Sequence, residues 1–449
     1  MNFIERPRLN AVAGPIFGEF LLGYTVVIAG LWLASHTSDG AAGSLGLANQ
    51  VLESLYVVFR VLAIGMGVVI TQLLGGKQLE LVRRTALAGL GACTWAGALV
   101  VAILVLGNDA ILDLLNAPDE ILPLVSPYLQ LLAPAALLDG YNLTMASILR
   151  AHLHVRDSLK VMVVMHSTHL ALAVPLMLGV GPWEGLGLYG FAVALLISRA
   201  LGLALHLVLW RKRMDLVPSA RHWWVLQPSV LAPVLRIGVP GASAELGYRV
   251  AFMVSLASAA RLGVAALATH AYTLQLLRYV LLISLAIGWA CEIMVGRLVG
   301  AGQFTQAHML VRKGLRNGIM ASGGMAVLAA LASPWLMHVF TKDPHVIQAA
   351  HTLLWIAVAL ETGRAFNLII TGALRATGDV IYPVAASLGS FFLVLGAGSY
   401  IMGRNFGLPG IFIAYAADEC VRGLLMWSRW HWHGWLPHAR SSQRRVKKR

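Results

Sequence analysis

Charged side chains are scarce in this chain. Asp, Glu, Lys and Arg make up 12% of its 449 residues, whereas 58% are hydrophobic and the mean hydropathy is +0.74. Soluble domains carry about 25% charged residues. The charges that remain stand mainly between long apolar runs. The composition therefore excludes an ordinary soluble protein and favours a helical protein that crosses the bilayer many times.

The chain also lacks the marks of several kinds of chemistry. Its three cysteines, Cys93, Cys291 and Cys420, are far apart and form no CxxC pair, which argues against a disulfide framework or a cysteine metal site. The run Gly75-Gly-Lys77 has neither the spacing nor the hydroxyl of a phosphate-binding loop. No nucleophile stands beside a base in a known pattern. The sequence therefore predicts no enzyme, no cofactor and no metal site.

Long apolar segments are present instead, several of them longer than the ~20 residues that a helix needs to cross a bilayer. There are twelve, at about residues 11–34, 45–74, 86–107, 122–149, 160–180, 186–210, 231–260, 265–298, 314–338, 346–374, 380–402 and 407–430. We therefore expect an all-α integral membrane protein with twelve transmembrane helices.

Lys and Arg gather in alternate connections between these segments. The basic connections are 75–85, 150–160, 211–236, 299–316 and 375–379, and both ends of the chain are basic too. Cytoplasmic loops of membrane proteins are enriched in Lys and Arg. We therefore expect both termini to be cytoplasmic. The net charge of +14 is expected to meet lipid headgroups and water, with no nucleic acid as partner.

The two halves of the chain repeat one another. At a shift of 225 residues Pro15 matches Pro240 and Asn142 matches Asn367, and later the shift falls to 220, where Gly187 matches Gly407. Each copy holds six helices, so both copies have the same orientation and are related by an axis along the membrane normal. We predict two six-helix bundles related by pseudo-two-fold symmetry. Their bounds are 1–210 and 233–435, with a cytoplasmic linker at 211–232 and a basic cytoplasmic tail at 436–449.

Four short motifs stand at or beside the predicted helices. Gly75-Gly-Lys-Gln78 and Gly300-Ala-Gly-Gln303 follow the second and eighth helices, and GALRATGD at 372–379 follows the tenth. The fourth, Asp418-Glu419-Cys-Val-Arg422-Gly423, lies in the last helix. Together they resemble a multidrug and toxic compound extrusion (MATE) transporter, of the multidrug/oligosaccharidyl-lipid/polysaccharide exporter superfamily, over about residues 10–435. The resemblance implies a secondary active antiporter in the bacterial cytoplasmic (inner) membrane. Such a protein exports amphipathic, often cationic small molecules in exchange for H+ or Na+ by alternating access.

One position departs from the pattern that the resemblance implies. Many members of that family carry an aspartate about fifteen residues past the proline of the first helix. Here that place is Gly30, and the nearest acid is Glu19, four residues past Pro15. The usual ion site of the first helix is therefore not expected in its usual form.

Fourteen charged residues fall inside the predicted helices, and each would cost at least ~3 kcal/mol at the bilayer centre if it stood alone. Glu361 precedes Arg364 by three residues and Glu245 precedes Arg249 by four, so each pair can meet on one helical face. Burial disfavours a charged carboxylate, while a nearby arginine favours it. This opposition suits a group that takes and loses a proton in each cycle. We expect Glu245 and Glu361 to couple the ion.

Three further residues join this set of ion-coupling and cavity residues. Asp139 has no obvious partner on its own helix, so it is another candidate for the ion site. Asn142 and Asn367 hold equivalent repeat positions, and we expect both to face the central cavity or the bundle interior.

The other charges are interpreted as gates or braces. Glu53 and Arg278 hold equivalent repeat positions with opposite sign and could close a gate between the halves. Asp418 or Glu419 can pair with Arg422 within one turn near the cytoplasmic end of the last helix, which favours a static brace.

A second function stays open at this point. A lipid-linked oligosaccharide or lipid flippase of the same superfamily would use cavity arginines to hold a pyrophosphate, and six arginines lie within the predicted helices. We favour the small-molecule antiporter, acting as a monomer in the lipid bilayer.

Overall fold

The computed structural model describes residues 8–448, and the side chains of residues 8–447. Apart from an isolated bridge between Val180 and Trp183, the regular structure in that part is helical. Eleven of its helices are long and apolar enough to cross a membrane. One of them, Ile381–His431, holds two of the predicted spans and has non-helical dihedral angles at Gly407. The prediction of an all-α protein with twelve spans is confirmed.

The chain folds into two compact units. The N-terminal unit comprises Gly18–Ile70 and Leu79–Gly238, and the C-terminal unit comprises the chain up to Phe17, Thr71–Gln78 and the chain from Val239 onward. Three helices, α1 (Leu9–Ser35), α3 (Val57–Gly75) and α9 (Pro228–Ala260), therefore have residues in both units. The predicted bundle bounds 1–210 and 233–435 are contiguous, whereas these units are interleaved along the sequence. The predicted bounds stay a proposal about the repeat.

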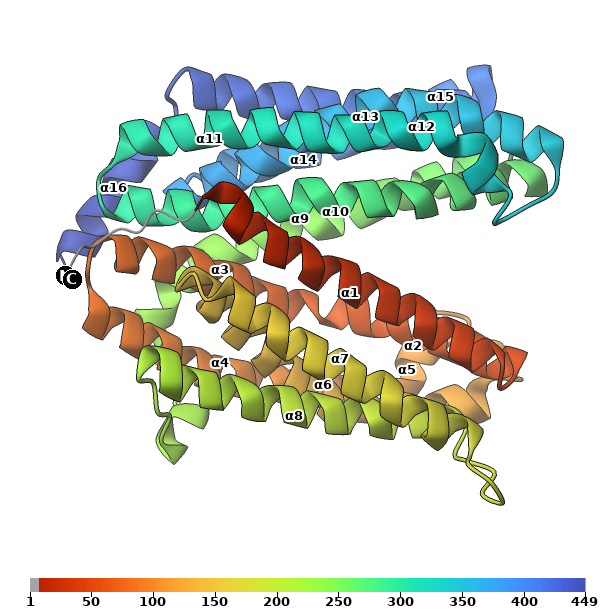
Figure 1. Ribbon diagram of the computed structural model, residues 1–449, viewed down its shortest axis with the longest axis horizontal. Helices are drawn as coiled ribbons and strands as arrows, with labels where there is room; N and C mark the ends of the chain where they lie inside the picture. The colour runs from red at the N-terminus through yellow and green to blue at the C-terminus, as the bar shows by residue number, and fades with distance from the viewer. Residues whose placement is uncertain (1–7, 449) are drawn as a thin grey trace. The chain divides into compact units, whose positions relative to one another are not determined.

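The N-terminal unit is built around α6. Besides parts of α1 and α3, its helices are α2 (Asp39–Leu55), α4 (Leu79–Leu106), α5 (Asn108–Leu114), α6 (Leu122–Ala151), α7 (Val155–Leu178), α8 (Leu188–Met214) and a 3-10 turn at Ala220–Trp223. Helix α6 packs along α4, α8 and α2, and α7 packs along α8 (Figure 1). Its buried face contributes Tyr128, Leu129 and Leu132 to the apolar core of this unit.

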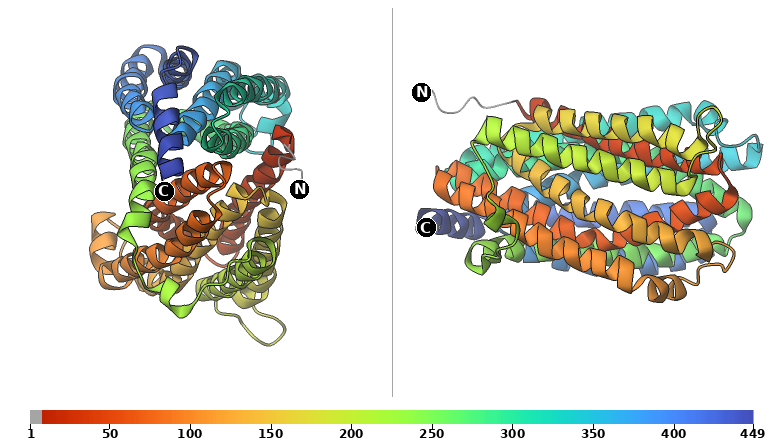
Figure 2. Two further views of the ribbon diagram at one scale, coloured as in Figure 1. Left: turned by 90° about the vertical axis from the view of Figure 1, so that its left-hand side faces the viewer. Right: turned by 90° about the horizontal axis from the view of Figure 1, so that it is seen from below.

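The C-terminal unit is built around α13. Its helices are α10 (Val264–Gly300), α11 (Phe304–Gly318), α12 (Gly324–Met337), α13 (Pro344–Thr377), α14 (Ile381–Ser390), α15 (Ala397–His431) and α16 (Leu436–Lys448), with π-helical segments at Ile319–Gly323 and Phe391–Gly396. Helix α13 packs along both α10 and α15. The long helices of each unit run roughly parallel to one another in the right-hand view of Figure 2.

Local chemistry sets the ends of α13. Asp343 caps its start by accepting a hydrogen bond from the His345 amide at 2.9 Å, and Pro344 stands in the first turn, where no amide hydrogen is needed. Gly378 ends the helix in the left-handed conformation with φ of 90°, which glycine adopts without a steric penalty. This turn belongs to the GALRATGD motif.

The start of α1 packs within the C-terminal unit. The Asn317 side-chain amide donates to Asn10 Oδ1 at 3.2 Å, and a Leu9 methyl lies near Gly314. Both partners stand on α11, more than three hundred residues later in the chain. The first helix of the sequence thus begins in one unit and continues in the other.

Candidate functional site

The face of α13 that meets α15 carries three polar residues at helical spacing. Glu361, Arg364 and Asn367 follow one another every three residues, so they line one side of the helix. Glu361 is fully buried, Asn367 is 2% exposed, and the Arg364 side chain is 14% exposed. The structure contains the predicted Glu361–Arg364 ion pair.

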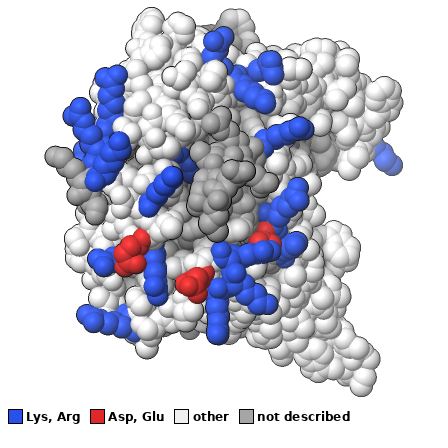
Figure 3. Space-filling view, turned by 60° about the vertical axis from the view of Figure 1, so that its left-hand side comes forward, with Lys and Arg blue, Asp and Glu red and all other residues white. Residues whose placement is uncertain are grey.

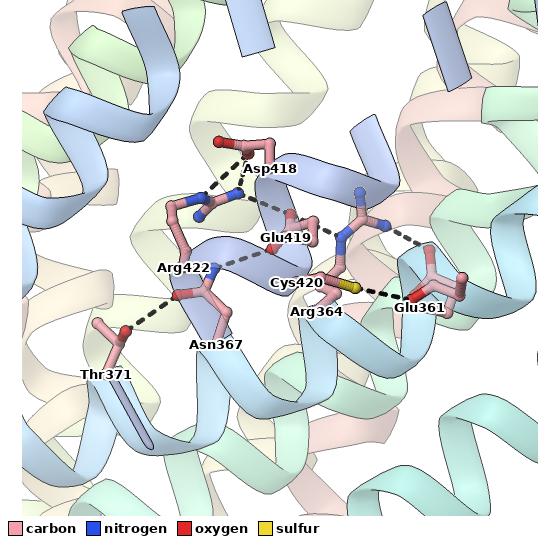
Figure 4. A network of polar contacts seen from close by, with 9 residues as sticks. Glu361, Arg364, Asn367, Thr371, Asp418, Glu419, Cys420 and Arg422 are labelled. Carbon is pink, nitrogen blue, oxygen red and sulfur yellow. Dashed lines mark hydrogen bonds and ion pairs between the residues drawn. The ribbon is translucent and has the colours of Figure 1, made fainter. Parts of the chain in front are cut away.

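Helix α15 presents a matching polar face. Arg364 Nε lies 3.1 Å from Glu419 Oε1, and the Asn367 amide donates to Glu419 Oε2 at 2.9 Å (Figure 4). Arg422 Nη2 reaches Asp418 Oδ2 at 2.5 Å and Glu419 Oε1 at 3.0 Å. Asp418 or Glu419 was predicted to pair with Arg422, and the structure contains both pairs. Through Glu419, the predicted brace residues are connected to the predicted cavity residues Arg364 and Asn367 in one network.

This network holds more negative than positive charge. Its three carboxylates, Glu361, Asp418 and Glu419, meet two guanidiniums, Arg364 and Arg422, which leaves a formal charge of −1. Among the described residues, Glu361 Oε2 is buried and has no hydrogen-bond partner. Burying an unbalanced carboxylate costs several kcal/mol, on the order of the penalty for any uncompensated buried charge. The site can relieve that cost by taking up a proton or a metal cation.

A smaller polar cluster lies inside the N-terminal unit. Asp139 on α6 forms an ion pair with Arg199 on α8, with Oδ1 and Nε 2.6 Å apart, and accepts a hydrogen bond from the Tyr56 hydroxyl at 2.9 Å. Asn142, one turn further on α6, donates to the Arg199 carbonyl at 3.0 Å, and its Oδ1 lies 3.0 Å from His206 Nδ1. Asn142 is 4% exposed, so it faces the interior of its own unit. Asp139 thus finds its partners on other parts of the chain.

The two clusters occupy equivalent repeat positions with reversed charge. Position 139 corresponds to 364 at the shift of 225, and position 199 corresponds to 419 at the shift of 220. The first pair is Asp139–Arg199 and the second is Arg364–Glu419. In both units the equivalent asparagine, Asn142 or Asn367, bonds to the residue at the second position. The sequence analysis missed this correspondence, although the two shifts taken together predict it.

The packing around Gly30 explains the missing first-helix acid. A Cβ atom built on Gly30 would lie 2.9 Å from Cζ of Phe191, closer than real Cβ contacts allow. The Phe191 ring therefore occupies the space that a side chain at position 30 would need. Phe191 also meets His169 edge-on, with ring centroids 4.6 Å apart. A carboxylate at position 30 would require this aromatic contact to rearrange.

The remaining predicted residues are located as follows. Glu245 and Arg249 lie one turn apart on α9, and both are half-buried. Glu53 on α2 and Arg278 on α10 are exposed, and they belong to different units. The roles proposed for these four residues in coupling and gating stay predictions.

Two predicted loop arginines lie inside helices instead. Arg150 ends α6, is 5% exposed, and lies 2.7 Å from Glu19 Oε2. Arg375 lies in the last turn of α13 and reaches Glu292 Oε2 at 2.6 Å. The placement of both arginines in loops was wrong, because α6 and α13 continue for two and three residues beyond the apolar runs that end at 149 and 374. A guanidinium bound to a buried acid can end a helix inside the protein.

These features define a class of protein. An all-helical chain with twelve apolar spans, two repeated halves and ion-paired charges in both is typical of membrane transporters that move solutes by alternating access. By these features the chain is a multi-pass membrane transporter rather than an enzyme.

Comparison with known proteins gives the family. The MatE family model matches residues 15–174 and again 240–401, two segments that begin at the repeat-related Pro15 and Pro240. The uncharacterized transporter YisQ of Bacillus subtilis is 30% identical over 95% of this chain and 94% of its own length. The probable multidrug resistance protein NorM of Thermotoga maritima is 24% identical over 94% and 91% of the two chains. The chain belongs to the MatE family, as its resemblance to MATE transporters implied.

Solved structures agree with this fold. The crystal structure of the Vibrio cholerae MATE transporter VcmN in the bent form has a TM-score of 0.85 at 18% identity, covering 97% of this chain and 97% of that one. A crystal structure titled "MATE in the bent conformation" has a TM-score of 0.88 at 15% identity, covering 97% and 96%. At these identities the likeness concerns the fold alone.

Proposed function

We propose that this protein is a secondary active antiporter that exports amphipathic, cationic small molecules in exchange for H+ or Na+. The observation that carries the proposal is the buried network of α13 and α15, which holds one carboxylate more than it holds guanidiniums. An organic cation, a sodium ion or a proton can each supply the missing positive charge. The multidrug resistance named for the relative NorM supports the substrate class.

Exchange follows from competition for the same excess charge. With Glu361 ionised, the excess negative charge of the network attracts a cation to the carboxylates. Protonation of the carboxylate, or Na+ bound to it, removes that attraction and releases the substrate. Because each ligand weakens the binding of the other by the same factor, the ion gradient can drive export. In this proposal Glu245, half-buried on α9, is the second coupling acid.

The network also bears on the rival flippase. Of the six arginines within the predicted helices, Arg199, Arg364 and Arg422 each lie within 3.1 Å of a carboxylate. A guanidinium already bound to an acid is a poor ligand for a pyrophosphate, since the phosphate must displace its partner. This observation favours the small-molecule antiporter over the flippase.

The decisive experiment measures dye movement in inverted vesicles. With protein level normalised, ethidium transport is followed after a proton or a sodium gradient is imposed. The variants are Glu361→Gln, Glu245→Gln and the double mutant. We expect the double mutant to lose gradient-driven transport. Glu80→Gln is the matched control, because Glu80 also pairs with an arginine in the same helix but is 67% exposed. Full transport by the double mutant would place the ion site elsewhere, with Asp139 or Glu19 next to be tested. A surface-glycan defect without dye transport would favour the flippase.

We also propose that the protein lies in the bacterial cytoplasmic membrane as a monomer, with both termini in the cytoplasm. One face of the molecule carries many Lys and Arg side chains and few acids, which supports this orientation (Figure 3). Single cysteines at Ser38, Asp119 and Lys342 should react with an impermeant reagent added outside, whereas cysteines at Gln78 and Ser219 should not. The reverse labelling pattern would overturn the orientation.

A further inference from the structure

The basic end of the chain forms a helix that the sequence did not predict. After Trp435, which stacks on Trp430 with ring centroids 4.4 Å apart, helix α16 packs on α10 and α13 at the end of the C-terminal unit (Figure 1). Ala439, Ser442 and Val446 form its buried face. Its opposite face is exposed and cationic, comprising Arg440, Arg444, Arg445 and Lys447. The helix is therefore amphipathic, and its narrow buried face holds it on the protein.

Three side chains of α16 pack against three glycines. The Ser442 hydroxyl donates to the Thr377 carbonyl at 2.9 Å and lies 2.6 Å from the place of a Cβ on Gly378. Gln443 Nε2 lies 2.1 Å from the place of a Cβ on Gly302, and a Val446 methyl lies 2.2 Å from that of Gly76. All three glycines belong to the sequence motifs GGKQ, GAGQ and RATGD. A Cβ at any of the three would meet a side chain of α16, which would have to shift.

Gly76 directly follows α3, which is shared between the two units. Residues Val57–Ile70 of α3 belong to the N-terminal unit, whereas Thr71–Gly75 belong to the C-terminal unit. This last turn is packed tightly. The Gln72 amide donates to the Ala376 carbonyl at 2.8 Å. A Cβ on Gly75 would lie 2.0 Å from the Arg297 carbonyl oxygen, and one on Gly300 would lie 1.9 Å from that of Gln72.

This crossing of α3 and α10 is self-complementary under the repeat. Gln72 corresponds to Arg297, and Gly75 corresponds to Gly300, at the shift of 225. Each glycine lets its helix approach the equivalent carbonyl of the other. An interface of this kind joins a turn from the first half of the chain to its counterpart in the second half. Helix α16 packs beside it and contacts the loop that follows each of the two helices.

We propose that α16 is a latch that holds the end of α3 against α10 and α13 and releases it during transport. The proposal rests on the antiporter function, because alternating access requires the two repeated halves to move. Since α3 continues into the N-terminal unit, that movement must either bend α3 or free its last turn. Helix α16 determines whether α3 bends or its last turn is freed, because the Val446 side chain packs against the loop at Gly76.

The contact is suited to repeated opening and closing. A helix of thirteen residues is marginal by itself in water, so α16 depends on its packing. That packing comprises few apolar side chains, the Ser442 hydrogen bond and the approach of His438 Nε2 to Asp379 Oδ1 at 3.7 Å. A permanent brace would gain from a wider apolar face than this one.

The test uses Leu73→Cys as a reporter in a chain whose three native cysteines are replaced. Leu73 lies in the last turn of α3 and is 4% exposed, so the thiol should react slowly with a maleimide in the purified, detergent-solubilised protein. Val446→Asp should release the latch and speed labelling about tenfold or more, the change expected when the burial of one valine is lost. Lys447→Asp is the matched control, since it changes a neighbouring exposed side chain on the same helix, and it should leave the rate within about twofold.

A second variant guards against an effect of the aspartate itself. Removal of residues 436–449 should give the same fast labelling as Val446→Asp. Equal labelling rates in the intact, Val446→Asp and truncated proteins would overturn the latch. Gradient-driven ethidium transport in vesicles tests the antiporter separately. A protein that transports the dye while its reporter does not respond refutes the latch alone. A responsive reporter in a protein that moves no dye refutes the proposed function alone.

Discussion

The polar clusters of the two units share one plan and differ in charge. Asp139–Arg199 and Arg364–Glu419 hold the same two repeat positions with signs exchanged. Around them the C-terminal unit has Glu361, Asp418 and Arg422, where the repeat positions of the N-terminal unit hold Ala136, Ser198 and Gly202. The first cluster is a balanced ion pair, and the second has an excess carboxylate.

This difference indicates how a duplicated transporter can divide its work. A balanced pair is satisfied without a further ligand, so it suits a structural role. An unbalanced network is costly until a cation arrives, so it suits binding and release. The shared asparagines show that the backbone arrangement is kept while the chemistry changes. The comparison therefore supports an ion site in the C-terminal unit, and each of its elements can be tested by substitution.

The largest effect is expected from reversing one charge of the balanced pair. Asp139→Arg places two guanidiniums together inside the N-terminal unit, which should cost at least about 3–5 kcal/mol of folding free energy. Adding Arg199→Glu gives this unit the sign order of the other and should restore more than half of the loss. Thermal unfolding in detergent measures both. If the double variant is no more stable than Asp139→Arg alone, positions 139 and 199 are not electrostatically equivalent to positions 364 and 419. Glu80→Arg, at an exposed pair, should change little.

The next effect separates the two arginines of the equivalent pairs. Arg364→Met strands both Glu361 and Glu419 and should cost about 3–5 kcal/mol. Arg199→Met should cost less, because the Tyr56 hydroxyl continues to donate to Asp139. Chemical denaturation of the purified proteins gives the order. If Arg199→Met lowers the free energy of unfolding more than Arg364→Met does, the C-terminal network does not depend more strongly on its arginine than the N-terminal pair does.

A smaller effect is expected from the equivalent asparagines. Asn367→Leu removes a hydrogen bond to the buried Glu419 carboxylate and should cost about 1.5–3 kcal/mol. Asn142→Leu removes bonds to a neutral carbonyl and to His206, and should cost about 1–2 kcal/mol. The measured quantity is the shift in thermal unfolding midpoint, with Asn→Asp at each position as a second variant. Asp at 367 should be the worse of the two, since it adds a further carboxylate to an excess of them.

Effects of similar size or smaller are expected at another pair of equivalent positions, Gly30 and Ser255. Gly30→Ser should cost about 1–3 kcal/mol, because its Cβ meets the Phe191 ring. Ser255→Ala should cost about 1 kcal/mol, because it removes the hydrogen bond of 2.6 Å to the Tyr415 hydroxyl. Thermal unfolding again provides the measurement. The variant Gly30→Ser combined with Phe191→Ala tests the reason, since the smaller side chain should remove most of the strain at position 30.

The spans and the short-range pairs could be predicted from the sequence. Apolar length identified the membrane helices, because a segment that crosses a bilayer must be long and uncharged. The spacing of Glu361 and Arg364 predicted their pairing, since both lie on one helix. Asp139 and Arg199 stand on different helices sixty positions apart, and nothing local connects them. Their relation to the pair Arg364–Glu419 appears only when the shift of 225 is applied to Asp139 and the shift of 220 to Arg199.

The helix ends were less predictable. Arg150 and Arg375 read as loop residues because the positive-inside pattern uses the same side chains. Their partners, the buried Glu19 and the half-buried Glu292, lie far away in the chain. Helix α16 was missed because its composition is that of a charged tail. Its helical form depends on a few contacts with three turns, those of Gly76, Gly302 and Gly378. These turns are far apart in the sequence and come together only when the chain folds.

The early residues of α1 have a consequence for biosynthesis. Asn10 finds its partner Asn317 only 307 residues later in the chain. At about 5–20 residues per second, the ribosome needs roughly 15–60 s to supply that partner. During this interval the beginning of the first helix is already made but cannot complete its packing. The first helix of the nascent chain is therefore inserted before the packing of its start on α11 can form. A ribosome-bound fragment that ends before α11 should be the stage most susceptible to cleavage by quality-control proteases.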